Sequence, residues 1–446
     1  MRPNTIEIRS HSRDTARPPT PTWHPLRAMA TAQSLSHVWP LGTTLNAAGH
    51  IEVGGCDLVE LAREFGTPAY IVAEDDLRAR AREFREAFAA VAADVHLSFA
   101  TKAFPCTAVL RVLSEEGIGA DVASGGELQI ALRAGVAPSM VTLHGNAKSE
   151  RELGEALDAG VGLIVADNAD ELERLERLAT REQDVMIRVA PDVRGDTHDH
   201  ISTGQADTKF GFSLADAPTA MERIRGSERL RLRGVHLHIG SQLLELDPFR
   251  RAIEAVAALG PMDAINVGGG LGVAYTPDDH PPSVHEYAAV KVGAIRESLG
   301  PDVAILDEPG RALVAAAGVT IYGVQSVKRN VSTWVAVDGG MSDNLRPMLY
   351  DARYEAHLAD RPGGSTRCHV TGKHCESSDV IVRDAMLDDP RPGDIVVTPV
   401  TGAYCYAMAN QYNGVPRAPV VFVRDGDARV VVRRETYDDL LSRDVI

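Results

Sequence analysis

Short apolar runs alternate with helically spaced apolar positions through the middle of this chain of 446 residues. Such alternation is the pattern of repeated β/α units, in which each strand is followed by a helix that covers the sheet. Eight units of this kind predict a closed (β/α)8 barrel of the TIM type. The strands are expected at residues 95–102, 119–123, 141–145, 162–166, 185–190, 234–239, 264–267 and 303–307.

Helix signals support this division. Ser149 and Glu152 have the spacing of a capping box, which marks the start of a helix directly after the third strand. Before the first barrel strand, an apolar run at 69–73 precedes a helical pattern at 77–91. We expect this strand and helix to lead into the barrel.

The pattern changes after residue 311, where alternating runs follow one another without long helices between them. Period-two alternation predicts an all-β domain, either a sandwich or a barrel. The runs lie at 319–324, 333–337, 379–382, 394–400, 419–423 and 428–433. We therefore divide the chain into a disordered leader (1–35), a segment packing with the β domain (36–68), the (β/α)8 barrel (69–314) and the β domain (315–446).

Composition narrows the possible partners. The 62 acidic residues exceed the 46 basic ones and give a formal charge of −16, which disfavours nucleic acid and anionic lipid surfaces. Five scattered cysteines without CxxC spacing, and the lack of a long apolar run, favour a reducing cytoplasm and no membrane span. The leader is rich in Arg, Pro, Ser and Thr, which is typical of disorder.

The carboxyl ends of the barrel strands carry the candidate chemistry, because this face of a β/α barrel holds the active site. A lysine alone at a strand end is usually solvated or paired with phosphate, so the meaning of Lys102 depends on its neighbours. The other strand ends carry Asp121, His144, Arg188, His238 with Ser241, Gly268 to Gly270, and Glu308 with Arg311.

These neighbours favour pyridoxal phosphate. Three consecutive glycines let backbone N–H groups approach a phosphate, although a tight turn is the common alternative, and Ser241 and Arg311 add donors at the same rim. Lys102 is then able to form a Schiff base with the cofactor aldehyde. Glu308 is the candidate partner of the pyridinium nitrogen, and a salt bridge to Arg311 is its alternative role.

Two histidines raise the question of a metal. His236 and His238 share one face of a strand, but the sequence offers no evident third ligand, so no metal is expected. We expect His238 to stack on the cofactor ring and His236 to have a structural role. His198 and His200 lie in a polar loop, where solvated histidines are the usual finding.

From about Val38 to its end, the chain resembles the fold type III pyridoxal-phosphate-dependent decarboxylases. The resemblance depends on FATKA (99–103), DVASGGEL (121–128), HGNAKS (144–149), ISTG (201–204), KFG (209–211), HIGS (238–241), GGGLG (268–272), EPGR (308–311), DGGMSDNLR (338–346), GKHCES (372–377) and GAY (402–404). The chain departs from the family pattern at Phe99, Ala147 and Ser378, none of which carries an assigned chemical group.

The resemblance implies roles for named residues. Lys102, Cys375, His238 and Glu308 are the expected catalytic residues. The expected cofactor contacts are Lys102, Asp121, His238, Ser241, Gly268, Gly269, Gly270, Glu308, Pro309, Gly310, Arg311 and Tyr404. The resemblance also implies a homodimer with shared sites, in which Cys375 and Glu376 reach the partner's barrel and Cys375 returns a proton to Cα. An inert buried thiol is the alternative for Cys375.

A substrate with an amino acid group at each end suits the remaining residues. Its distal carboxylate needs cations, and its distal ammonium needs an anion. Arg311, Arg346 and Tyr350 are the candidates to bind the distal carboxylate, and Glu376 is the candidate to bind the distal ammonium. By the resemblance, Tyr404 contacts both cofactor and substrate. We therefore expect decarboxylation of meso-2,6-diaminopimelate to L-lysine, the last step of lysine biosynthesis.

Other functions of the same fold are the alternatives. A decarboxylase of ornithine, arginine or lysine would have no distal carboxylate for Arg346 to bind. A racemase needs a second proton-carrying base opposite Lys102, where this chain offers Cys375 instead. A non-catalytic pyridoxal-phosphate carrier would use the barrel alone, so the β domain would have no function in it.

Overall fold

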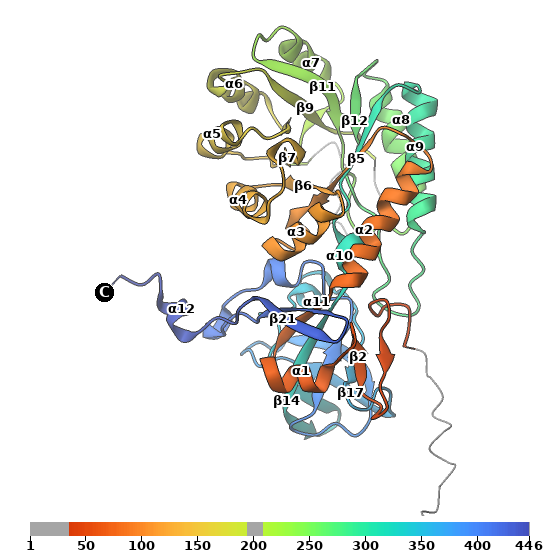
Figure 1. The fold of residues 1–446 in the computed structure, drawn as a ribbon, viewed down its shortest axis with the longest axis vertical. Coiled ribbons are helices and arrows are strands. Elements are labelled where there is room, and N and C mark those ends of the chain that lie inside the picture. Colours follow the sequence, from red (N-terminus) through yellow and green to blue (C-terminus); the bar gives the residue numbers. More distant parts are fainter. Residues whose placement is uncertain (1–34, 194–207, 446) are drawn as a thin grey trace, which may run out of the picture. The chain divides into compact units, whose positions relative to one another are not determined.

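The structure, a computed structural model, describes residues 35–193 and 208–445. Within them, eight parallel strands pair in the order β9-β11-β12-β13-β5-β6-β7-β8, and pairing of β8 with β9 closes a barrel (Figure 1). The strands are β5 (Val95–Ala100), β6 (Gly119–Val122), β7 (Val141–Leu143), β8 (Leu163–Ala166), β9 (Gln183–Ala190), β11 (Leu230–His236), β12 (Ala264–Asn266) and β13 (Ala304–Asp307). This confirms the predicted barrel. Most of the predicted leader, the ISTG segment, His198 and His200 lie outside the described residues.

Helices alternate with these strands and surround the barrel (Figure 1). The capping box is present: Ser149 Oγ accepts from Glu152 N–H, and the Glu152 carboxylate accepts from Ser149 N–H. None of the helices in the described part of the chain is both long and apolar enough to cross a membrane. The helices are α2 (Glu74–Ala89), α3 (Thr107–Glu115), α4 (Gly125–Ala134), α5 (Glu150–Ala159), α6 (Ala169–Leu178), α7 (Ala217–Arg225), α8 (Asp247–Ala257), α9 (Val284–Leu299) and α10 (Arg311–Val314); the short strand β10 (Phe212–Ser213) pairs with β9.

The barrel interior is a packed core. Leu163, Val165, Met186 and Ala264 form a buried cluster separate from the main one. Ile164, between two of them on β8, belongs to the main core between strands and helices. Because successive side chains of a strand point to opposite sides, the separate cluster fills the interior of the barrel.

A second sheet carries the β domain. Its strands run in the order β18-β17-β15-β14-β4-β20-β21, and β19 joins β14 to β16. They are β4 (Ala69–Ala73), β14 (Gly318–Arg329), β15 (Thr333–Val337), β16 (His357–Leu358), β17 (Thr366–Thr371), β18 (Val380–Leu387), β19 (Ile395–Thr398), β20 (Val420–Arg424) and β21 (Asp427–Val432); the short helices of this part are α11 (Arg346–Tyr350) and α12 (Tyr437–Leu441). The chain thus folds into a barrel and a separate β domain.

Strand β4 differs from the sequence expectation. It pairs antiparallel with β14 and parallel with β20, so it is an inner strand of the second sheet and the barrel part begins only at α2. All five of its residues are buried. A strand covered on both faces reads as an unbroken apolar run, which does not reveal the sheet to which it belongs.

The segment before β4 lies against the second sheet. It contains β1 (Thr44–Leu45), β2 (Ile51–Val53), β3 (Cys56–Asp57) and α1 (Leu58–Phe65). Ile51 N–H donates to the carbonyl oxygen of Ala359 at 2.8 Å, and Gly426 N–H donates to that of Gly54 at 2.9 Å. These backbone hydrogen bonds join the amino-terminal segment to two parts of the β domain, after β16 and between β20 and β21.

The inner position of β4 predicts a large effect of Ile71→Ala. Ile71 is fully buried, so the substitution should lower the free energy of unfolding by about 2–5 kcal/mol. Val430→Ala on the half-exposed edge strand β21 is the matched control and should change it by less than about 0.5 kcal/mol. Urea unfolding of both variants tests this, and equal midpoints would contradict the position of β4.

Candidate active site

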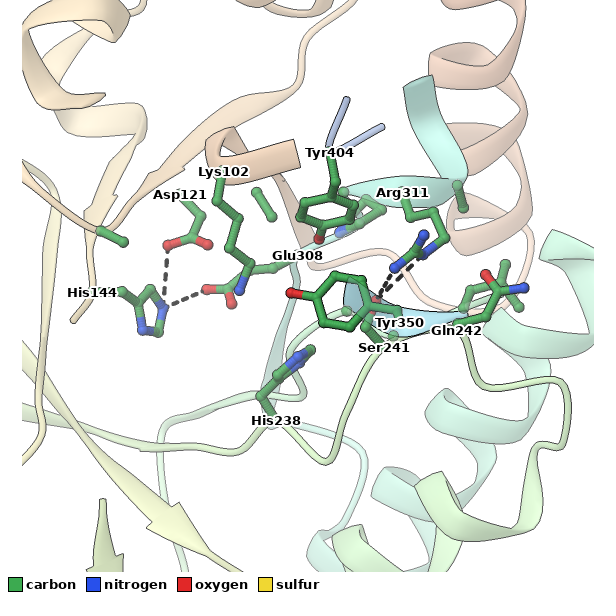
Figure 2. A pocket seen from close by; sticks show the side chains of 18 of the residues that line it. Lys102, Asp121, His144, His238, Ser241, Gln242, Glu308, Arg311, Tyr350 and Tyr404 are labelled. Atoms are coloured by element: carbon green, nitrogen blue, oxygen red, sulfur yellow. Dashed lines mark hydrogen bonds and ion pairs between the residues drawn. The ribbon is translucent and has the colours of Figure 1, made fainter. Parts of the chain in front are cut away.

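A cavity of about 690 Å³ opens at the carboxyl ends of the barrel strands (Figure 2). Segments of the β domain close it from the other side through Arg346, Tyr350 and Tyr404. Thirteen of the expected site residues line it: Lys102, Asp121, His238, Ser241, Gly269, Gly270, Glu308, Pro309, Gly310, Arg311, Arg346, Tyr350 and Tyr404. Lys102 itself lies just past β5, in a 3-10 turn of Thr101–Ala103.

Glu308, directly after β13, is the most constrained of these groups. Its two carboxylate oxygens contact His144 Nε2 at 2.8 Å and His236 Nε2 at 3.1 Å. Asn266 Nδ2 donates to the same carboxylate from the end of β12. Three strand ends of the barrel thus converge on one buried carboxylate.

This network keeps Glu308 ionised. Burial alone would raise its pKa, but the charges and hydrogen bonds of His144 and His236 hold that pKa well below the ordinary value. Burial and, to a smaller extent, the neighbouring His144 lower the pKa of His236 to about 3, against the opposing effect of Glu308. A neutral His236 that donates from Nε2 leaves its buried Nδ1 as an unpaired acceptor, in agreement with the described contacts.

His144, His236 and Glu308 also have the composition of a metal site. Their ligand atoms lie within 4.8 Å of one another. The hydrogen bonds that join them already satisfy the carboxylate, so the geometry gives no reason to assign a metal. His236 is nevertheless part of the site, whereas the sequence suggested a purely structural residue.

Asp121 lies at the edge of the same network. His144 Nε2 is 3.5 Å from Asp121 Oδ1 (Figure 2). Burial raises the pKa of Asp121 to about 7; the charge of Glu308 adds to this rise, while His144 and Lys102 oppose it. Near neutral pH this carboxyl group is therefore able to hold or release a proton.

His238 presents a neutral ring. Burial, together with the nearby charges of Lys102 and Arg188, lowers its pKa well below the ordinary value. A neutral imidazole beside a cationic lysine retains an aromatic face and adds no repelling charge. In Figure 2, Lys102 and His238 approach the cavity from opposite sides.

The phosphate rim combines a side-chain cluster with a glycine loop. Arg311 Nη2 donates to Ser241 Oγ at 3.0 Å, and Arg311 also donates to the Tyr275 hydroxyl. A side chain at position 269 would place its Cβ 2.2 Å from the carbonyl oxygen of Glu308, so only glycine fits there. Gly269 and Gly270 line the cavity, whereas Gly268 does not.

Tyr404 enters the cavity from a strained backbone. Its φ of 63° is unfavourable for a tyrosine, and its N–H donates to the carbonyl oxygen of Ala103 at 2.8 Å. Arg311 lies over its ring, 4.8 Å from the centroid. Strain held at such a position is typical of a functional residue.

Arg346 is a further arginine of the cavity, contributed by the β domain. It begins α11, is only 5% exposed, and lies 4.5 Å above the Tyr275 ring. It donates to the hydroxyl of Tyr354. A buried arginine surrounded by aromatic rings keeps its charge and retains donors for an anion.

Cys375 and Glu376 lie apart from this cavity within the same chain. Both are exposed, and neither lines it. Cys375 N–H donates to Asn413 Oδ1 at 3.0 Å, and the Tyr412 hydroxyl donates to the Glu376 carboxylate. These contacts fix the two residues on the outer surface of the β domain.

Comparisons with known proteins agree with this geometry. Residues 74–315 match the family model of the pyridoxal-dependent decarboxylase, pyridoxal binding domain. The diaminopimelate decarboxylase of Mycobacterium tuberculosis is 44% identical over 92% of this chain and 98% of its own. The chain belongs to the diaminopimelate decarboxylase family.

Among solved structures, the diaminopimelate decarboxylase of M. jannaschii has a TM-score of 0.86 and 32% identity over 91% of this chain and 98% of its own. That of Helicobacter pylori, complexed with L-lysine, has a TM-score of 0.81 and 33% identity over 86% and 98%.

Pyridoxal phosphate is the cofactor of a diaminopimelate decarboxylase, and the cavity fits it. The glycines let the loop pack closely against the neighbouring strand ends, and Gly269 and Gly270 border the cavity beside Arg311 and Ser241, whose side chains are suitable phosphate donors. The ionised Glu308 is a suitable partner for a protonated pyridine nitrogen.

Several residues around this cavity have no role assigned from the sequence. The sequence places His144 and Arg188 at strand ends but assigns them no role. It does not indicate Asn266, Tyr275 or Tyr354 as parts of the site. The useful signal was position: Asn266 stands two residues before the triple glycine, and an amide at a strand end is able to orient a carboxylate.

The raised pKa of Asp121 predicts a pH-dependent effect of Asp121→Asn. A carboxyl group whose pKa rises on folding binds more protons in the folded state, so stability falls as pH increases from about 4 to about 7. Asparagine does not titrate. The melting temperature of the cofactor-free variant, minus that of the wild type, should therefore grow over this range and level off above it. A constant difference would contradict the raised pKa.

Proposed function

We propose that the protein decarboxylates meso-2,6-diaminopimelate to L-lysine and CO2 with pyridoxal phosphate in the barrel cavity. The observation that carries this proposal is the combination, in one cavity, of Lys102, an ionised Glu308, a glycine loop and two of its arginines, Arg311 and Arg346. The first three suit the cofactor. The second arginine, Arg346, suits a substrate with a distal carboxylate.

Pyridoxal phosphate, when bound, supplies an electron sink for the pair left by the departing carboxylate. We assign Lys102 to bond with the cofactor and to yield to the substrate amine. Glu308 keeps the ring nitrogen protonated, because its own pKa is held low. The neutral ring of His238 stacks against the cofactor and limits its tilt.

At the rim, Ser241, Arg311 and the N–H groups of the glycine loop hold the phosphate. Arg311 already contacts Ser241 and Tyr275, so its guanidinium is oriented before any ligand binds. Pro309 and Gly310 complete this side of the cavity. Asp121 lines the opposite side and faces His144.

Arg346 and Tyr350 bind the distal carboxylate of the substrate, with Tyr404 between cofactor and substrate. Arg346 is buried, and desolvation strengthens a charge-assisted hydrogen bond to an anion. A substrate without this carboxylate leaves Arg346 unpaired in the cavity, which penalises ornithine and lysine.

Cys375 and Glu376 act on the cavity of a second copy of the chain. Both are exposed and lie outside the cavity of their own chain, as a shared site requires. Cys375 returns the proton to Cα, and Glu376 binds the distal ammonium. The protein therefore works as a homodimer.

Substrate choice tests this proposal together with Arg346→Ala. CO2 release should be fastest from meso-diaminopimelate among this compound, ornithine, arginine and lysine. Arg346→Ala should raise the KM for meso-diaminopimelate by about 10- to 100-fold, because a charge-assisted pair is lost, with a smaller change for Arg346→Lys. Faster turnover of ornithine would contradict the substrate, and an unchanged KM would contradict the role of Arg346.

Subunit mixing tests the shared site. Lys102→Ala and Cys375→Ala should each be inactive or nearly so, but a mixed dimer contains one site with both residues intact. Equal mixing with free exchange should restore roughly a quarter of the wild-type activity. Verified mixed dimers without recovered activity would exclude the contribution of Cys375 from the partner.

A further inference from the structure

Lys291 on α9 is a buried lysine with no part in the proposed reaction. Its side chain is fully buried, and its Nζ donates to the carbonyl oxygens of Val267 and Gly268 at 3.1 and 2.9 Å. Nζ also contacts Asp307 Oδ2 at 2.6 Å and the Tyr287 hydroxyl. The two carbonyls and the carboxylate match the three donors of a lysine amine.

These acceptors adjoin two parts of the proposed cofactor site, the glycine loop and Glu308. Gly268 opens the glycine loop, and Asp307 directly precedes Glu308. The loop also packs on this strand end, since Glu308 N–H donates to the Gly268 carbonyl oxygen at 3.2 Å. Lys291 therefore connects the end of β12 to the end of β13 from below.

The orientation of one peptide unit follows from these contacts. In a trans peptide the C=O and N–H groups point in opposite directions, so the Gly268 carbonyl on Lys291 leaves the Gly269 N–H on the far side. Gly269 lines the cavity. Successive glycines have wide backbone freedom, so the orientation of this peptide depends on the two donors to the Gly268 carbonyl, Lys291 Nζ and Glu308 N–H.

We propose that Lys291 is a positioning residue for phosphate recognition: it clamps the Gly268 carbonyl and so directs the Gly269 N–H to the cofactor phosphate, while the Gly268 N–H is bonded to Asn266 Oδ1. This inference rests on the proposed cofactor site. It assigns to Lys291 an effect on the phosphate group alone, because the ring and the aldehyde are held by other residues.

A second buried lysine provides the matched control. Lys148 Nζ donates to the carbonyl oxygens of Gly145 and Val165 at 2.6 and 2.9 Å and pairs with Glu171 at 2.8 Å. It has the same chemistry as Lys291, but it braces the ends of β7 and β8 rather than the glycine loop. Loss of either lysine removes a buried ion pair, and only loss of Lys291 releases the loop.

The test compares the Kd of pyridoxal phosphate with that of pyridoxal, which lacks the phosphate, by absorbance titration of the full-length cofactor-free protein. Lys291→Met should lower the preference for the phosphorylated form about tenfold or more, because hydrogen bonds that orient the loop are lost. Its Kd for pyridoxal should stay near the wild-type value. Lys148→Met should leave the ratio of the two constants unchanged.

A double variant covers the case in which Lys291→Met does not fold. Lys291→Met with Asp307→Leu removes both charges, and such apolar replacement of a buried pair is often tolerated. It should show the same loss of phosphate preference. An unchanged ratio in the folded variant, or an equal loss in Lys148→Met, would overturn the inference and leave the proposed function intact. A wild-type protein without phosphate preference would overturn both.

Discussion

The ionised carboxylate of Glu308, buried at the carboxyl end of the barrel, is the constraint on which the site depends. Removing such a charge from water is strongly unfavourable unless other groups hydrogen-bond to it. His144, His236 and Asn266 do so, and they come from three other strand ends. The closed barrel is what brings these donors to one point.

The same strand end organises the phosphate side. Glu308 N–H bonds to Gly268, position 269 has no room for a side chain beside Glu308, and Lys291 holds Gly268 and Asp307 together. Hydrogen bonds thus connect the residues proposed to contact the pyridine ring with those proposed to hold the phosphate.

The β domain contributes the groups that suit a particular substrate. Arg346 is held between aromatic rings, and the strained backbone of Tyr404 is fixed by a bond to Ala103, beside Lys102. Strand β4 and the segment before it tie this domain to the start of the chain. In the proposed function, the barrel therefore supplies the cofactor chemistry and the β domain supplies selectivity.

The sequence by itself determined the barrel, its eight strands and the cavity residues at the strand ends, because period, capping and strand-end position are local signals. It did not determine that β4 belongs to the second sheet, since a fully buried strand has no alternation that marks its partner. Only the tertiary structure decided the donors around Glu308, the place of Cys375 outside its own cavity, and the clamp by Lys291. Each of these depends on which distant strand ends meet in space, and spacing along the chain does not encode that directly.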